Sequence, residues 1–442
     1  MRSIGLSLSL LFVGCSGDGF IDEEAAEAAR AKLSPQTLAG VMRSSPLPKA
    51  PIDPSNQVAG DPRAVELGRA LFYDERLSAN QAISCATCHD PALDWTDGKE
   101  TAVGLNSFRT HTPSLWNVAF NRWYFWDGRA DSLWAQAIQP WEHPDEMGGD
   151  RVSFTRIISD DAELSSSYES LFGTLPDTSS WPSSAKPVEG EPEDPLQLAW
   201  ASMGEEAQRD ATEVLVNMAK AVAAFEREIV SGEAPFDRYV RGLKTGDPAE
   251  LTSLDEEQLL GMELFFGEAR CHLCHHGPLF SDLEFHDVRL PYASDSAGEP
   301  LREFGRWEGI KLVQDDPYNG LGEYADVPPL EPGEFAPDSG SARGHLEFLL
   351  RTPHTKGEFK TASLRNVERT APYTHRGVYK DLEELMEHYS SLHDAPPKQH
   401  TDTEEILIPL GLSQKEKQAL IAFLRSLTSE KDIPESLLPP TR

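Results

Sequence analysis

The pentapeptide Cys-x-x-Cys-His occurs twice in the chain, at residues 85–89 (CATCH) and 271–275 (CHLCH), and it constrains the fold more than any other feature. A segment that begins with Leu-Gly and carries leucine and aromatic anchors precedes each copy, at residues 67–73 (LGRALFY) and 260–266 (LGMELFF). We expect each segment to form a helix that leads into its cysteine motif. Two copies of one supersecondary unit predict two related domains.

The spacing within each copy is typical of covalent haem attachment. Two thiols spaced in this way can meet the two vinyl groups of a haem, and the adjacent imidazole can bind its iron. A zinc site or two redox disulfides would also use the thiols, but both leave His89 and His275 unexplained. We therefore predict two covalent haem c groups with His89 and His275 as iron ligands. The attachment residues are Cys85, Cys88, Cys271 and Cys274.

The fifth cysteine, Cys15, closes an apolar run that follows the single positive charge of Arg2. This pattern predicts an export signal over residues 1–14. Residues 12–15 (FVGC) resemble a lipobox, which predicts acylation of Cys15, with plain secretion as the alternative. We expect a periplasmic protein anchored to a membrane as a lipoprotein through Cys15.

The charge balance restricts the partners of the protein. The 442 residues include 40 Lys and Arg against 73 Asp and Glu, a net charge of −33. A surface this acidic repels phosphate, which argues against nucleic acid as a partner. A macromolecular electron donor would dock through a basic face. No apolar run approaches the roughly 18 residues of a membrane span.

The rest of the chain indicates helices and loops, without alternating strands or βαβ spacing. We expect helices over residues 21–33 and 209–230, and capping boxes at Ser253 and Ser413 that open two more. The predicted division is a tether over residues 15–60, a first domain over 61–242 and a second over 243–442. Two stretches have the composition of surface loops, residues 173–196 and 292–340.

Further sequence blocks support a family resemblance. They lie at residues 100–104 (ETAVG), 125–130 (FWDGRA), 235–239 (PFDRY), 280–282 (FSD), 363–367 (SLRNV) and 371–377 (APYTHRG). With the two cysteine motifs, they make residues 61–427 resemble the bacterial di-haem cytochrome c peroxidase superfamily, which includes the MauG-type enzymes. The resemblance implies a mainly α-helical fold of two cytochrome c-like domains, each with one covalent haem c. The N-terminal haem would be the peroxide site, and the C-terminal haem would take up electrons.

The resemblance also implies roles for individual residues. Trp126 matches the tryptophan that couples the two haems, and Gln136, Pro140 and Glu146 match the peroxide pocket, with Glu146 as acid and base. The ordinary alternatives are a core aromatic for Trp126, a helix residue for Gln136 and a solvated charge for Glu146.

The sequence departs from the family at Leu105, where peroxidases that need reductive activation carry an iron-binding histidine. Leucine cannot bind iron, so we expect the N-terminal haem to keep an open face. His111 stands where the family usually has an asparagine that helps to bind an interdomain calcium ion. Thr370 and Pro372, whose counterparts offer carbonyl oxygens to that ion, are kept, and calcium therefore remains an open expectation.

The second departure concerns the C-terminal haem. Tyr389 stands where typical peroxidases have a methionine ligand and MauG-type enzymes a tyrosine. It shares a helical face with Leu382, Leu385 and Met386. We predict Tyr389 as the second iron ligand, with Met386 as the alternative.

Three functions follow from these residues. The first is a peroxidase that reduces hydrogen peroxide with electrons from a small cytochrome c or cupredoxin. The second is a MauG-like enzyme that uses peroxide to oxidise aromatic residues of a partner protein. A non-enzymatic electron carrier is third, and Leu105 beside Glu146 argues against it. A homodimer stays open.

Overall fold

The computed structural model describes residues 21–294, 299–326, 346, 348–396, 406–430 and 433–440, so the predicted export signal and Cys15 lie outside it. In this part of the chain the protein is mainly helical, as predicted. The described strands form two short antiparallel pairs. They are β1 (Phe285–His286) with β4 (Phe359–Lys360), and β2 (Ala293–Ser294) with β3 (Pro300–Leu301). No helix in the described ranges has the length and apolar character needed to cross a membrane.

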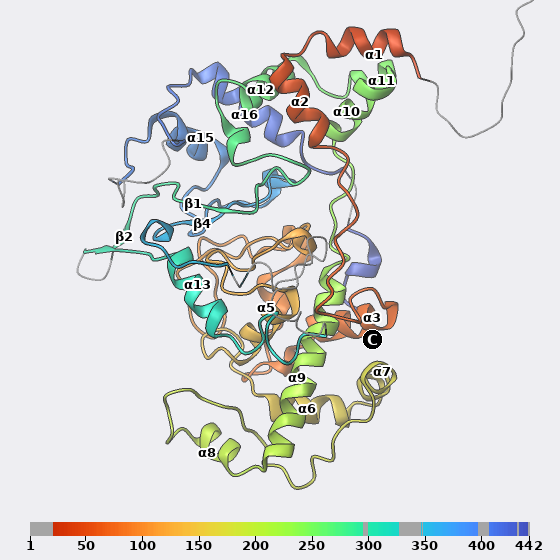
Figure 1. Cartoon of the computed structure of the whole chain (residues 1–442), viewed down its shortest axis with the longest axis vertical. Helices are drawn as coiled ribbons and strands as arrows, with labels where there is room; N and C mark the ends of the chain where they lie inside the picture. Colours follow the sequence, from red (N-terminus) through yellow and green to blue (C-terminus); the bar gives the residue numbers. More distant parts are fainter. Residues whose placement is uncertain are drawn as a thin grey trace, which may run out of the picture.

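A first unit forms around α9 (Glu205–Glu226), the long helix in the lower half of Figure 1. Helices α3 (Pro62–Phe72) and α5 (Leu133–Glu142) pack against it. The helix predicted over residues 209–230 is present, but it begins and ends four residues earlier, and the face that was expected to be apolar is buried. The remaining helices of this unit are α4 (Cys85–Cys88), α6 (Arg151–Asp160), α7 (Ala162–Phe172) and α8 (Pro195–Ala201).

A second unit has its own hydrophobic core, built by phenylalanines from several helices. Its helices are α10 (Pro235–Thr245), α11 (Pro248–Leu251), α12 (Glu256–Phe266), α15 (Leu382–Ser391) and α16 (Gln414–Arg425). Phe236 of α10 lies in this core, so the packing divides the chain before α10 rather than near residue 242. Ser413 caps α16 as expected. Helix α12 differs, because Asp255 is its N-cap and not Ser253.

The two motif glycines occupy equivalent places in the two units. A Cβ atom on Gly68 of α3 would overlap the Ala221 carbonyl oxygen of α9, and a Cβ on Gly261 of α12 would overlap the Ala419 carbonyl oxygen of α16. Only glycine permits backbones to approach this closely. The repeat seen in the sequence is therefore a repeated pair of packed helices, α3 with α9 and α12 with α16. In each pair, the first helix leads into a cysteine motif.

The N-terminal segment is not a free tether in its described part. Helices α1 (Glu23–Arg30) and α2 (Pro35–Arg43) pack on the second unit, next to α10 and α12. Gln36 Nε2 donates to the Phe266 carbonyl oxygen at 2.6 Å. The chain then runs down to the first unit (Figure 1), where Asn56 Nδ2 donates to the Lys220 carbonyl oxygen at 2.9 Å. The helix expected over residues 21–33 is α1. Its apolar face packs against α10 and is therefore buried.

One of the two expected loop insertions contains a helix. Helix α13 (Arg306–Asp315) lies within residues 292–340. Arg306 Nη1 donates to the Gly128 carbonyl oxygen at 2.7 Å, which ties the insertion to the first unit. Residues 173–194 are loop, as expected, and α8 begins at Pro195.

Candidate functional site

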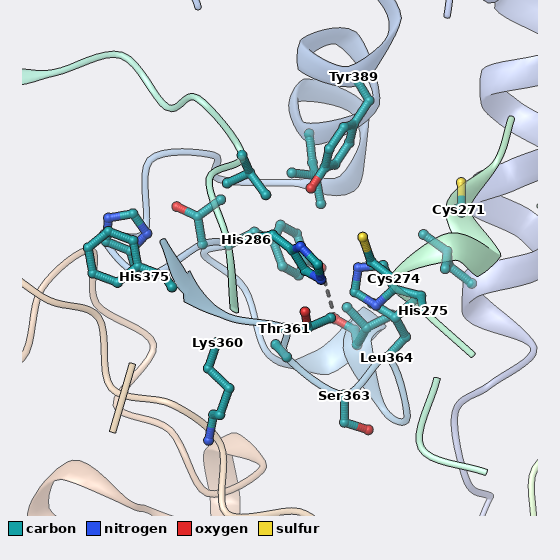
Figure 2. A pocket seen from close by; sticks show the side chains of 18 of the residues that line it. Cys271, Cys274, His275, His286, Lys360, Thr361, Ser363, Leu364, His375 and Tyr389 are labelled. Carbon is teal, nitrogen blue, oxygen red and sulfur yellow. Dashed lines mark hydrogen bonds between the residues drawn. The ribbon is translucent and has the colours of Figure 1, made fainter. Parts of the chain in front are cut away.

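The second cysteine motif borders a cavity of about 320 Å³. Figure 2 shows Cys271, Cys274 and His275 at one side of this cavity. Neither thiol forms a disulfide, although both are partly buried. Burial raises the pKa of the Cys271 thiol to about 12, so it is a neutral thiol in this environment. Two unpaired thiols at the wall of an apolar cavity fit a prosthetic group attached through both.

The imidazole of His275 is held so that one nitrogen is left for a ligand. Its Nδ1 lies 2.8 Å from the Phe280 carbonyl oxygen. A carbonyl can only accept a hydrogen bond, so Nδ1 carries the proton and Nε2 keeps its lone pair. Burial also lowers the pKa of His275, which keeps the ring neutral. A backbone carbonyl on the far nitrogen is the usual way in which proteins orient a metal-binding histidine.

Tyr389 reaches the cavity from α15. Its hydroxyl points into the space beside Cys274 and His275 (Figure 2). Burial, followed by the nearby thiols of Cys271 and Cys274, raises its pKa above the usual range. Met386, one turn earlier on α15, lines the same cavity. Tyr389 and Met386 therefore both line the cavity that His275 borders. Which of the two binds the iron stays a prediction.

The first cysteine motif repeats this arrangement. Cys85 and Cys88 lie at the two ends of the one-turn helix α4 and are unpaired and partly buried. The Nδ1 of His89 lies 3.1 Å from the Trp95 carbonyl oxygen, and burial lowers the pKa of the ring. Both histidines thus have Nδ1 held by a backbone carbonyl oxygen.

Leu105 and Glu146 lie together beside the first motif. The Leu105 N–H donates to the Glu146 carbonyl oxygen at 2.9 Å, and a Cβ on Gly104 would come within 2.7 Å of the Glu146 backbone. Cys88 Sγ lies 3.9 Å from the Val103 carbonyl oxygen, in the same loop. The loop that would carry a histidine in other peroxidases therefore brings a leucine next to the predicted acid and base.

The side chain of Glu146 is partly buried. Burial raises its pKa, the nearby Arg129 guanidinium lowers it, and Asp145 raises it further. Helix α5 supports this position, because the Met147 N–H donates to the Pro140 carbonyl oxygen at 3.2 Å. Gln136 lies on α5 one turn before Pro140. A carboxylic acid held in this way suits proton transfer to a bound substrate.

Trp126 lies at the junction of the two units. Its indole Nε1 donates to the His111 carbonyl oxygen at 2.8 Å, and its ring centroid is 6.4 Å from that of His375. The His111 N–H donates in turn to the His375 carbonyl oxygen at 2.8 Å. Trp126 also lines the cavity of the second motif. Trp126 therefore lines the second cavity, contacts His111, and belongs to neither of the two large hydrophobic cores.

The residues expected for calcium, Thr370 and Pro372, line the same cavity. Among the described residues, the acidic, cysteine and histidine side chains close enough to share a metal are Cys274, Asp282 and His286. A thioether bond would remove Cys274 from that group. The calcium ion stays a prediction.

Two basic residues near these sites were not singled out in the sequence. Arg129 acts on Glu146, and it lies in the FWDGRA block, which was the available signal. Lys360 lines the second cavity and has no motif of its own. The pairing of β4 with β1, which the sequence does not indicate, places it there.

Comparison with known proteins decides the family. Residues 62–245 match the family model described as di-haem cytochrome c peroxidase. The methylamine utilization protein MauG of Methylorubrum extorquens is 30% identical over 408 residues, which cover 92% of this chain and 89% of that protein. The chain belongs to the di-haem cytochrome c peroxidase family.

Other relatives carry both names found in this family. The cytochrome-c peroxidase IdrP1 of a Pseudomonas species is 29% identical over 394 residues, covering 88% of this chain and 86% of that protein. The crystal structure of a MauG-like protein associated with microbial copper homeostasis covers 90% of this chain and 99% of that chain, with a TM-score of 0.58 and 24% identity. This similarity shows that the two chains share a fold over 90% of this chain. The family implies two haem c groups, and the unpaired thiols and oriented imidazoles fit them.

Proposed function

We propose that this protein is a di-haem peroxidase that reduces hydrogen peroxide to water, with one covalent haem c in each unit. The observation that carries the proposal is the pairing of Leu105 with Glu146 beside the first motif. Leucine leaves one face of that site without a protein ligand. Glu146, whose backbone carbonyl accepts the Leu105 N–H, supplies an acid next to that face. The attachment residues would be Cys85, Cys88, Cys271 and Cys274, and His89 and His275 would bind iron.

The residues of the first site would manage the protons of the reaction. Haem iron supplies the redox chemistry that cleaves the O–O bond when the group is bound. Glu146 would take the proton from the near oxygen of peroxide and return it to the leaving oxygen, which departs as water. Gln136 would hold the substrate by hydrogen bonding. Two electrons and two further protons complete the conversion of one peroxide into two water molecules.

Electrons would reach this site through the second unit. Trp126 would couple the two sites, and its indole donates a hydrogen bond to the His111 carbonyl oxygen. The donor would be a small cytochrome c or cupredoxin with a basic face, because this chain carries a net charge of −33.

The test replaces the acid and keeps its shape. Glu146→Gln should lower peroxide turnover about 10²- to 10⁴-fold, the range for loss of an acid–base group. The matched control is Glu163→Gln, since Glu163 is exposed on α7 away from the site. Turnover of Glu146→Gln at the wild-type rate would refute the role of Glu146.

Spectroscopy tests the open face independently of turnover. Electron paramagnetic resonance of the isolated ferric protein should show a high-spin signal from the first haem. Two low-spin haems would contradict the argument from Leu105.

The second candidate is a MauG-like oxidation of aromatic residues on a partner protein. The Tyr389 hydroxyl in the second cavity favours it, because an oxygen ligand stabilises the ferric and higher oxidation states. Fast peroxide-dependent oxidation of a reduced cytochrome c would support the peroxidase. Very slow turnover with modified aromatic residues in a partner, detected by mass spectrometry, would support the MauG-like enzyme.

The proposed location and assembly of the protein rest on sequence patterns alone. We propose a periplasmic protein anchored by lipid at Cys15, which radiolabelled palmitate and a Cys15→Ser variant would test. A homodimer and an interdomain calcium ion at Thr370 and Pro372 stay predictions.

A further inference from the structure

The second cavity has two chemically different ends. Cys271 and Cys274 lie at one end, and His375 and Lys360 lie toward the other (Figure 2). A haem carries its vinyl groups on one edge and its two propionates on the opposite edge. A haem joined to the two thiols, as the proposed function requires, therefore directs two carboxylates toward the end with His375 and Lys360.

Carboxylates in a cavity of this kind need a cation, because burial of an unpaired charge is costly. Among the described residues that line the cavity, the arginines and lysines are Arg270, Arg289, Lys360 and Arg365, and His286 is paired with Asp282 at 2.7 Å. Arg365 is bound to Asp237, with Nη1 2.8 Å from Oδ2. Arg289 directs its Nε and Nη2 to the Pro396 carbonyl oxygen, at 3.0 and 2.8 Å. Arg270 immediately precedes Cys271 and so belongs to the thiol end.

Lys360 is the cation that Figure 2 shows on the side of the cavity away from the cysteines. Its Nζ donates to the Trp123 carbonyl oxygen at 3.2 Å, a long bond to a neutral acceptor. Burial lowers the pKa of the amine to about 8, and the carboxylate of Asp127 acts in the other direction. The Lys360 amine, with three N–H donors and one long bond, can therefore still donate hydrogen bonds to an anion.

The backbone of Lys360 fixes its position relative to the electron route. Its N–H donates to the Trp126 carbonyl oxygen at 2.9 Å, and β4 places the residue beside β1 of the second unit. Figure 2 shows the amine extending from β4 away from the cysteine end. The backbone of Lys360 thus contacts Trp126 directly, and its amine contacts Trp123 of the same segment.

We propose that Lys360 binds a propionate of the haem held by Cys271 and Cys274. Its positive charge would then offset the propionate charge on the side of that haem near Trp126. The assignment rests on the proposed function. Without this cation, a buried carboxylate would keep its negative charge unpaired and would stabilise ferric over ferrous iron. Lys360 is a positioning and tuning residue in this scheme, because it touches the prosthetic group and not the peroxide.

The test is a reduction titration followed by optical spectroscopy on the purified full-length protein. Lys360→Met should shift the reduction equilibrium of the second haem about tenfold toward the ferric state, which is about 59 mV for one electron. Lys360→Arg keeps the charge and should stay within about twofold of the wild type. The first haem, in the other unit, serves as internal reference.

The control for a general loss of positive charge is Lys380→Met. The Lys380 side chain is 75% exposed and pairs with Glu384 on the surface of the same unit. It should leave both potentials unchanged. If Lys360→Met does not accumulate, Lys360→Gln replaces it, because its amide can still donate to the Trp123 carbonyl.

The outcomes separate this assignment from the proposed function. Two intact covalent haems with an unmoved second potential in Lys360→Met would overturn the assignment alone. An equal shift in Lys360→Arg would also overturn it, since charge would then not be the cause. A wild-type protein without covalent haem, judged from its pyridine haemochrome spectrum, would overturn the proposed function and the assignment with it.

Discussion

Glu226, at the end of α9, is a buried acid that should make the stability of the first unit depend on pH. Its side chain is buried, and Oε2 has no hydrogen-bond partner among the described residues. Burial raises the pKa of Glu226 from 4.5 to about 8. The folded state therefore holds a proton that the unfolded chain releases between these two pH values.

The sign and size of the effect follow from proton linkage. The stability that Glu226 contributes is fully present below about pH 4.5, falls as the pH rises toward 8, and is constant above that. Each pH unit in this window costs about 1.4 kcal/mol, which gives an upper limit of about 5 kcal/mol. Glu226→Gln should therefore match the wild type near pH 4.5 and exceed it progressively up to pH 8.

The assay is guanidinium chloride unfolding of both proteins at several pH values, followed by circular dichroism. The difference between variant and wild type at each pH removes the contribution of all other groups. Glu206→Gln, at an exposed position on the first turn of the same helix, should show no pH-dependent difference. Parallel pH profiles for Glu226→Gln and the wild type would refute the reasoning.

Three further predictions test other parts of the structure. Leu105→His should supply the missing ligand, so the first haem becomes low-spin in electron paramagnetic resonance and turnover of the unreduced enzyme falls at least about tenfold; an unchanged high-spin signal would contradict this. Tyr389→Met should raise the reduction potential of the second haem, whereas an unmoved potential would mean that Tyr389 does not bind iron. Gly68→Ala and Gly261→Ala should each lower the free energy of unfolding by about 1–3 kcal/mol by forcing the paired helices apart, as measured by chemical denaturation. Gly60→Ala, with open space around its Cβ position, is the control and should be near neutral.

The sequence predicted the parts of the site that depend on local spacing. The two cysteine motifs, the helices before them and the helical face of Tyr389 all follow from short-range patterns. The placement of Trp126 between the units came from the family blocks. Comparison confirmed the family, whereas the roles of Glu146, Gln136 and Trp126 stay predictions.

The sequence could not show features that arise from contacts between distant segments. Residues 21–60 contain ordinary short helices and prolines, and only the packing on α10 and α12 shows that they are part of the body. Lys360 and Glu226 resemble surface charges when they are considered alone. Their burial comes from the junction and from the core of the first unit, and these depend on the whole fold.

The main-chain bond between His111 and His375 has a mechanical consequence. It joins the two halves of the molecule by peptide groups, whose geometry does not depend on side-chain rotamers. In the proposed function, this bond would hold constant the separation that an electron crosses near Trp126. Solvent viscosity should accordingly have little influence on the internal transfer rate, even where it slows the approach of the donor.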